Sequence, residues 1–233
     1  MSEQQQVLEA DPDAPIRNAT QVAGYFRDDC RNLRDALQLE MVVAQYHLRM
    51  RDTRSPEGIP VGEAVSAGVI TELERHGDVL SHAILRGLEH LGTGDTKTRS
   101  ADAVARLSER GVGLPAKLAD VGTAHAIGAW RDSEGGWDGE YSLFAEFEHP
   151  LGRRHSLALF VEPRHGGAVK HIGLIDPLGE LDYPGSLEPM PIADAGALLG
   201  KLLDRSFRPS LELTDDYRVV IAHARARSMV AGG

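Results

Sequence analysis

This chain of 233 residues has very little cysteine and no long run of apolar residues. Its single cysteine, Cys30, excludes an intrachain disulfide framework and points to a reducing compartment. No apolar stretch approaches the roughly 20 residues that a membrane-spanning helix needs. The first 15 residues are polar and acidic, and they lack the apolar core of a secretion signal. We therefore expect a soluble, cytoplasmic protein that does not bind membranes.

Positive charge is also scarce. The chain has 25 Lys and Arg residues against 35 Asp and Glu residues, which gives a formal net charge of -10. Because nucleic acids bind proteins mainly through Lys and Arg, this balance disfavours nucleic-acid binding through the whole surface. Hydrophobic residues make up 42% and charged residues 26%, as in ordinary globular proteins, so a disordered chain is excluded.

Sequence motifs of catalysis are absent too. The chain has no Gly-x-Ser-x-Gly, Cys-x-x-Cys, His-Glu-x-x-His or Gly-x-Gly-x-x-Gly pattern. Residues 92–98 superficially resemble a phosphate-binding loop, but Lys97 does not directly follow the last glycine and no strand precedes the segment. The lone Cys30 lies on an apolar helical stripe, where a buried, inert thiol is expected. These observations favour a protein that is not an enzyme and has no cofactor.

The N-terminal half shows the 3.6-residue period of helices. After a flexible acidic tail at residues 1–16, the pattern predicts one long helix from Thr20, as its N-cap, to about Asp52. Its apolar stripe consists of Val22, Phe26, Cys30, Leu33, Leu37, Met41, Ala44 and Leu48. Further apolar residues flank this stripe, so we expect the helix to be central or shared with another chain.

A second stripe predicts another long helix, from about Gly62 to Leu91, with Gly92 as its stop. Two long helices joined by a short connection pack antiparallel, so we expect a helical hairpin. A short helix capped by Ser100 follows. The predicted helical region spans residues 17–122.

The apolar period then changes from 3.6 to 2. Alternating segments separated by Gly- and Pro-containing loops predict an antiparallel β-meander from Tyr141 to Asp176. A further strand at about 126–131 precedes it, and two helices follow, at about 193–206 and after the N-cap Thr214. We therefore predict an α+β fold. Residues 123–233 form an antiparallel sheet with C-terminal helices, either as a separate domain or continuous with the helical region.

The register of the meander follows from its apolar rows, since a one-residue slip turns every side chain to the other face. The rows agree across three strands when Phe147 pairs with Leu157 and Leu159 pairs with Leu174. This register needs a five-residue first loop and a Gly166-Gly167 turn in the second hairpin.

Histidines in the meander suggest a metal site, because imidazole and carboxylate are ligands of zinc and iron. The register places His149 beside His155, and with Glu148 these residues are the candidate ligands of a divalent metal. Glu162 and His171 fall on the opposite face, where an ordinary cross-strand ion pair is expected. Two histidines also fall short of the three protein ligands of a catalytic zinc. Strand-end polar residues without a metal are the alternative.

A second candidate is His76, which lies in the apolar stripe of the second predicted helix. Glu72 precedes it by one turn, and antiparallel packing places Glu40 in the same region. Helical bundles build metal sites from such groups, but their Glu-x-x-His spacing is missing here. We favour a core histidine with one hydrogen-bond partner.

A faint helix-turn-helix pattern lies at residues 118–125, after the predicted helix at 100–110. Pro115, the short spacing at Gly122 and the strand that follows all depart from that pattern. The acidic chain also lacks the basic surface of a DNA-binding protein. A helix-turn-helix regulator is therefore a minor alternative.

Two functions remain as hypotheses. The favoured one is a non-enzymatic binding or protein-interaction protein that forms a homo-oligomer, or binds another protein, through the apolar first helix. Surplus apolar surface motivates it, including Phe144 and Phe160 opposite the main core face of the meander. The alternative is a metal-dependent hydrolase that uses His149, His155 and Glu148.

Overall fold

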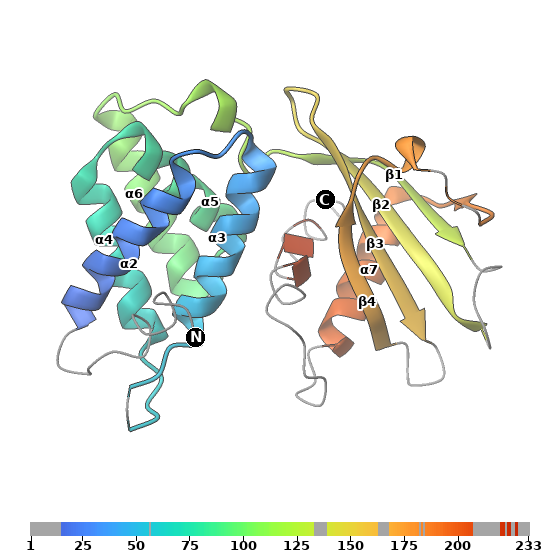
Figure 1. Cartoon of the computed structure of the whole chain (residues 1–233), viewed down its shortest axis with the longest axis horizontal. Helices are drawn as coiled ribbons and strands as arrows, with labels where there is room; N and C mark the ends of the chain where they lie inside the picture. Colours follow the sequence, from blue (N-terminus) through green and yellow to red (C-terminus); the bar gives the residue numbers. More distant parts are fainter. Residues whose placement is uncertain are drawn as a thin grey trace. The chain divides into compact units, whose positions relative to one another are not determined.

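The structure is a computed structural model with an α+β fold, as predicted (Figure 1). It describes residues 15–55, 57–132, 139–162, 168–181, 183, 185–206, 220, 221, 223, 224 and 227. The chain divides into two compact units, Met1–Gly122 and Thr123–Gly233. None of the described helices has the length and apolar character needed to cross a membrane.

The first unit is a bundle of helices (Figure 1). Its helices are α2 (Pro15–Cys30), α3 (Ala36–Arg51), α4 (Gly62–His76), α5 (Val79–Leu91) and α6 (Gly94–Glu109). Helix α2 packs on α4, α3 packs on α5, and α6 packs on both α4 and α5. A short 3-10 helix, η1 (Ala116–Leu118), follows.

Each of the two predicted long helices is in fact two helices, so that part of the prediction was wrong. Local caps explain both breaks. Gly77 ends α4 in a left-handed conformation (φ +64°), which glycine adopts without strain, and Asp78 caps α5 by accepting a hydrogen bond from the Ser81 N–H at 2.8 Å. Asp35 caps α3 in the same way, through the Gln38 N–H at 2.9 Å. The apolar period continues through both breaks, which is why periodicity alone did not reveal them.

Two predicted N-caps also lie inside helices. Helix α2 begins at Pro15 rather than Thr20, and α6 begins at Gly94 with Ser100 buried in its middle.

Part of the apolar surface of the predicted first helix is buried within the helical unit. Phe26 of α2 and Tyr46 of α3 stack with ring centroids 4.2 Å apart, and Val22, Cys30 and Val43 are also buried. Tyr25 is 38% exposed, however, and Leu33, Leu37, Met41 and Val42 are half-buried, so the chain covers only part of the surface that suggested a partner.

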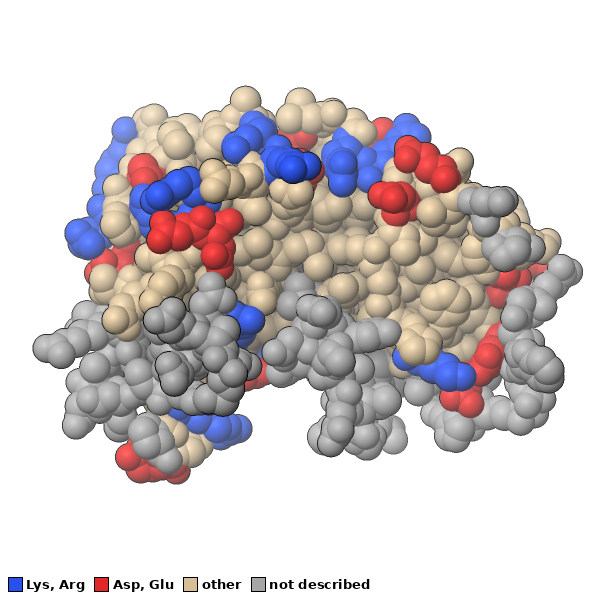
Figure 2. All heavy atoms as spheres, in the orientation of Figure 1, with Lys and Arg blue, Asp and Glu red and all other residues tan. Residues whose placement is uncertain are grey.

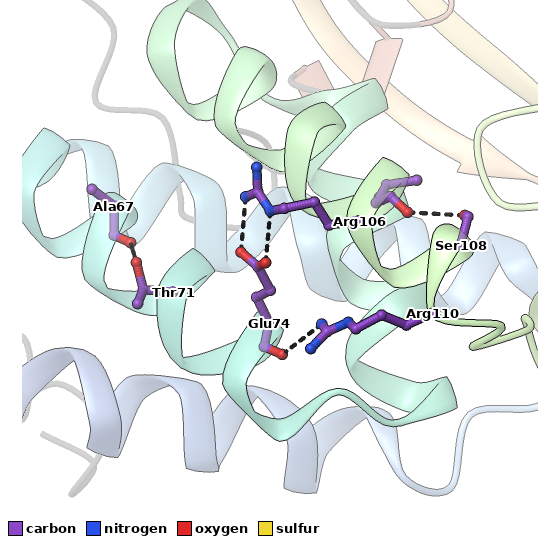
Figure 3. A network of polar contacts seen from close by, with 7 residues as sticks. Ala67, Thr71, Glu74, Arg106, Ser108 and Arg110 are labelled. Carbon is purple, nitrogen blue, oxygen red and sulfur yellow. Dashed lines mark hydrogen bonds and ion pairs between the residues drawn. The ribbon is translucent and has the colours of Figure 1, made fainter.

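An ion pair and a hydrogen bond fix α4 against α6 near the ends of both helices (Figure 3). The Arg106 guanidinium donates to both carboxylate oxygens of Glu74, at 2.7 and 2.9 Å, and Arg110 donates to the Glu74 carbonyl oxygen at 3.2 Å. Since these contacts join the C-terminal parts of two packed helices, α4 and α6 run in the same direction. Their N-termini therefore lie at the same end of the bundle.

The second unit contains a five-stranded sheet of order β4-β3-β2-β1-β5, with every pairing antiparallel. The strands are β1 (His125–Asp132), β2 (Tyr141–Glu148), β3 (Arg154–Glu162), β4 (Ala168–Ile175) and β5 (Glu188–Pro189). The predicted meander and the additional strand are confirmed, whereas the short β5 was not predicted. Helix α7 (Ile192–Ser206) covers one face of the sheet (Figure 1). The last predicted N-cap, Thr214, lies outside the described residues.

The register of the first hairpin differs by two residues from the prediction, because Phe147 pairs with His155 rather than with Leu157. The loop has three residues instead of five. Gly152 donates a hydrogen bond from its N–H to the His149 carbonyl oxygen at 2.8 Å and adopts φ +84°, as in three-residue hairpin loops. Both loop lengths are odd, so every side chain stays on its predicted face.

The second hairpin is also shifted by two residues, since Leu174 pairs with Leu157 rather than with Leu159. A bulge between Phe160 and Val161 changes the register within the hairpin. The predicted Gly166-Gly167 turn lies outside the described residues.

A smaller apolar cluster occupies the sheet face opposite α7. Phe144, Ala158 and Leu178 are buried there, and Tyr183 packs edge-on against Phe144 with ring centroids 5.0 Å apart. The segment after β4 thus covers Phe144. Phe160 stays 44% exposed on this face.

Candidate functional site

A cavity of about 740 Å³ opens in the helical unit. Three helix ends and the connection before α4 form its lining: His47, Arg51, Pro60, Val61, Gly62, Glu63, Ala64, Ser66, Thr93, Gly94, Asp95 and Thr96. The volume lies in the range of roughly 300–1,000 Å³ that is typical of small-molecule sites. We therefore take this cavity as the candidate functional site.

His47, on α3, is the most unusual group of the lining. Its side chain is buried, with 4% of the residue exposed, and neither ring nitrogen has a hydrogen-bond partner among the described residues. Burial lowers the pKa of His47 to about 4; the positive charge of Arg51 adds to this effect and Asp52 opposes it. The imidazole is thus neutral at pH 7. Both ring nitrogens lack accessible surface, so they do not face the cavity, and a buried polar group of this kind costs about 1–3 kcal/mol of stability.

The starts of α4 and α6 form the second feature of the cavity. Their N-cap residues, Val61 and Thr93, make no side-chain hydrogen bond to the helix, whereas α3 and α5 are capped by Asp35 and Asp78. The first N–H groups of a helix have no partner within that helix, and its N-terminus carries about half a positive charge. Two helix starts without side-chain caps therefore bring hydrogen-bond donors to the cavity. The C-terminal end of α3, which carries the opposite partial charge, lines the same cavity, and its Met50 and Arg51 carbonyl oxygens lie close to Gly62 at the start of α4.

Charged side chains of both signs also line the cavity. Arg51 forms an ion pair with Asp52, with Nε 2.9 Å from Oδ1. Asp95 pairs with Arg99 one turn later in α6. The carboxylate of Glu63 is exposed at the start of α4. Within the described part of the chain, no three His, Cys, Asp or Glu side chains are arranged to hold a metal ion.

Of the three predicted metal ligands, the structure brings the two histidines together but not the carboxylate. The rings of His149 and His155 are buried, with centroids 5.6 Å apart. Glu148 alternates with Phe147 along β2 and so lies on the other face, where it pairs with Arg154 (Oε1–Nε 2.8 Å).

A third histidine, missed by sequence reasoning, completes the cluster. His223 is helical and fully buried, and its ring centroid lies 5.5 Å from that of His155. It is 68 residues away in the chain, and no local pattern relates it to the meander. A buried Arg227 donates to the Ala124 carbonyl oxygen at 3.3 Å near the start of β1.

The residues of the predicted bundle site do not come together. His76 is exposed at the end of α4, so its interpretation as a core histidine was wrong. Glu72 pairs with Arg75 at 2.8 Å. Glu40 is buried and accepts a hydrogen bond from the Gly122 N–H at 2.8 Å.

The register also differs at Glu162 and His171, which are not directly opposite each other in the sheet. Glu162 pairs with Ala168 in the sheet, and His171 pairs with Phe160, with ring centroids 6.3 Å apart. The prediction that Cys30 is buried is confirmed.

Two segments with faint motifs have clear structural roles. Residues 92–98 open α6 directly after α5, and four of them line the cavity. Where a helix-turn-helix pattern was noted, the structure has the three-residue η1 and turns before β1. On the face drawn in Figure 2, basic side chains of the described residues lie among acidic ones.

Comparisons with family models, with curated proteins and with solved structures found no match to this chain. The chemistry of the cavity is therefore the basis for a functional assignment.

Proposed function

We propose that this protein is a non-enzymatic binding protein and that its helical unit holds a small molecule in the cavity formed by the ends of α3, α4 and α6. One observation carries the proposal: the ends of α3, α4 and α6 form a cavity of about 740 Å³ that is lined by both polar and apolar residues. This volume is typical of small-molecule sites, where polar groups orient the ligand and apolar surface buries the rest of it.

The lining also favours binding over catalysis. A histidine that activates a nucleophile forms a hydrogen bond with a hydroxyl or a thiol. Within the described structure, His47 makes no such bond to Ser66, Thr93 or any other group. The lining thus offers recognition groups without an activated nucleophile.

The protein-interaction form of the hypothesis has less support. Val22, Phe26 and Val43 are buried inside the unit, so much of the apolar surface that suggested an interface already has partners within the chain, although Tyr25 is 38% exposed. The partly exposed Phe160 is a single residue, and single exposed apolar side chains are ordinary on protein surfaces.

A cavity-filling variant tests the proposal. Ala64 lines the cavity and is exposed, so Ala64→Trp should block the site without disturbing the core. Ala105→Trp on the exposed side of α6 is the matched control. Thermal unfolding of the whole chain would be measured with a panel of small organic anions, cations and neutral molecules.

A ligand at about 100 times its Kd should stabilise the wild type and Ala105→Trp by about 2.7 kcal/mol. The same ligand should leave Ala64→Trp unchanged. If every stabilising compound acted equally on both variants, or if no compound acted at all, the cavity would not be the binding site.

A further inference from the structure

We infer that the ligand of this cavity is a neutral polyhydroxyl compound, a sugar or a polyol, and that the hydroxyl groups of Ser66 and Thr96 on the cavity wall recognise it. This inference rests on the proposed function, since it names the ligand class of the same cavity. It adds the side chains that recognise the ligand, and it excludes a net charge on the ligand.

Ser66 of α4 is the first argument. It lines the cavity although only 3% of the residue is exposed, and its hydroxyl forms no hydrogen bond with any described residue. Ser100 of α6 is also buried without a hydrogen bond, but its oxygen has no accessible surface and it is not part of the lining. The Ser66 oxygen is not closed off in this way, so it faces the cavity. Since buried polar groups nearly always have a partner, that of Ser66 comes from what fills the cavity.

Thr96 supplies a second hydroxyl of this kind, from a different helix. It lies in the first turn of α6, lines the cavity and is 9% exposed. Its methyl carbon Cγ2 lies toward Gly92, where an added Cβ atom would be 3.2 Å away. The hydroxyl is the other branch of the side chain, and within the described part of the chain it forms no hydrogen bond.

Other hydroxyls in the same helices behave differently (Figure 3). Thr71 of α4 and Thr98 and Ser108 of α6 each donate to the carbonyl oxygen one turn earlier, at 2.9, 3.4 and 2.9 Å. This is the usual way in which a helical serine or threonine is satisfied. Ser66 and Thr96 make no such bond, so the two hydroxyls on the cavity wall stay available to a ligand.

The charges around the cavity favour a neutral ligand. Glu63 and Asp95 lie in the first turns of α4 and α6, where their carboxylates offset the positive ends of the two helices. Asp95 pairs with Arg99, which Glu63 also attracts, and Arg51 pairs with Asp52. Because each of these charges already has an opposite charge nearby, an anion or a cation would gain little in the cavity.

Hydroxyl groups are the natural complement of this wall. Each serine or threonine hydroxyl donates one hydrogen bond and also accepts, and a ligand hydroxyl does the same. A sugar or a polyol carries such groups all round a compact body, so it can reach α4 and α6 at once, whereas a single amide group is confined to one edge. Pro60, Val61 and Ala64 supply apolar surface for the C–H groups of the ligand.

The test is calorimetric titration of the whole chain with glucose, ribose, sucrose and mannitol, and with benzoate, benzylammonium and N-methylacetamide for comparison. Calorimetry is chosen because sugars and polyols stabilise any folded protein by exclusion from its surface, which would obscure a thermal shift. At least one of the four polyhydroxyl probes should bind with one site per chain, and Ala64→Trp should abolish this binding. Tighter binding of a sugar than of mannitol identifies a ring as the ligand, and the reverse identifies a linear polyol.

Two variants test the recognising groups. Ser66→Ala and Thr96→Val remove the hydroxyls and keep most of the side-chain volume, so each should weaken binding by about two- to tenfold, as expected for one neutral hydrogen bond. Ser100→Ala and Thr71→Val are the matched controls on the same two helices. Both should leave the affinity unchanged, since neither residue lines the cavity.

A measurement without ligand separates recognition from a structural role. The Ser66 hydroxyl bonds to no described residue, and alanine is the better helix former, so Ser66→Ala should not lower the midpoint of thermal unfolding of the free chain. A clearly lower midpoint would show that Ser66 supports the fold and would overturn its assignment as a recognition group.

Other outcomes separate this inference from the proposed function. If only benzoate, benzylammonium or N-methylacetamide binds and Ala64→Trp removes that binding, the cavity binds a ligand but the polyhydroxyl inference fails. If a sugar or polyol binds equally to wild type, Ser66→Ala and Thr96→Val, these hydroxyls do not recognise it and the inference fails as well. If none of the seven probes binds, both the inference and the proposed function are rejected.

Discussion

Arg27 of α2 and Asp78, the N-cap residue of α5, form an ion pair with Nη2 2.6 Å from Oδ2. The same guanidinium donates to the Ser81 hydroxyl at 2.7 Å, while the other carboxylate oxygen of Asp78 accepts the Ser81 N–H at 2.8 Å. One aspartate thus starts α5 and ties it to α2, at the break that divides the predicted second helix.

Replacing this aspartate should separate its two roles. Asp78→Ala removes both the cap and the ion pair, and we expect a loss of about 1–2 kcal/mol in the free energy of unfolding. Asp78→Asn keeps a capping oxygen, so its loss should be smaller, below about 1 kcal/mol, as for a partly exposed ion pair. Urea denaturation of the whole chain at pH 7 measures both values. Equal losses in the two variants would show that the cap contributes nothing.

The pH dependence of stability should report the same carboxylate. Burial opposes the ionisation of Asp78, but the hydrogen bonds from Ser81 and Arg27 outweigh it and hold the pKa of this carboxyl below its usual value. Its contribution to stability is therefore complete above the unfolded pKa of about 3.9 and is lost as the pH falls through the lower native pKa. Urea midpoints of wild type and Asp78→Asn, measured from pH 6 to pH 2, should converge at the acidic end. Parallel curves would contradict the assignment.

A side chain at Gly122 should destabilise the protein mainly because it would clash with the ring of His90, and not because of the backbone angle. Gly111 and Gly122 have nearly the same φ, +78° and +77°. A Cβ atom on Gly122 would lie within 2.0–2.5 Å of the His90 ring, whereas a Cβ on Gly111 meets nothing within 4 Å.

Gly111→Ala should therefore lose only about 1 kcal/mol, the usual strain of the left-handed region, and Gly122→Ala at least about 2 kcal/mol more. Urea denaturation of the two variants gives the difference directly. If both lose the same amount, the ring of His90 moves aside without cost.

The sequence was informative wherever a local pattern decides the structure. Alternation located β1 to β4, and the 3.6-residue period located the apolar face of each helix. Periodicity does not reveal breaks between helices, however. Gly77 ends α4 and Asp78 caps α5, but the apolar stripe continues across both residues, so the pattern predicted one helix. The predicted register of the first hairpin was wrong by two residues. The apolar rows allow a loop of any odd length, and it is the left-handed conformation of Gly152 that fixes the loop at three residues.

The candidate site was less predictable, because three separate helix ends form it. His47 lies between buried neighbours in α3, which resembles an ordinary core position in sequence. The one usable signal was at the helix starts: Val61 is a poor N-cap residue. Thr93 is a good one by type, and only the structure shows that its side chain makes no cap hydrogen bond. The histidine cluster could not be predicted for the same reason, because its third member, His223, comes from another element.

Zinc should not stabilise the histidine cluster. His149, His155 and His223 have neighbouring rings, but the described residues contain no group of three His, Cys, Asp or Glu side chains arranged for a metal ion. We expect the thermal midpoint of the metal-free chain to change by less than about 1 °C when equimolar Zn²⁺ is added. Stoichiometric binding that His149→Ala or His155→Ala abolishes would revive the metal hypothesis, and loss of binding in Glu148→Gln would restore the predicted ligand set.

Cys30 should react with thiol reagents only when the helical unit opens. Burial raises the pKa of its thiol well above the usual range, and the negative charge of Asp29 adds to this effect. Both the closed packing and the scarcity of thiolate slow the reaction, so labelling by Ellman's reagent at pH 8 should be at least ~10³-fold slower than in urea. Because the chain has one cysteine, the signal reports a single site. Destabilising substitutions in the same unit, such as Gly122→Ala, should accelerate labelling, whereas rapid and complete reaction of the folded wild type would show that α2 opens without global unfolding.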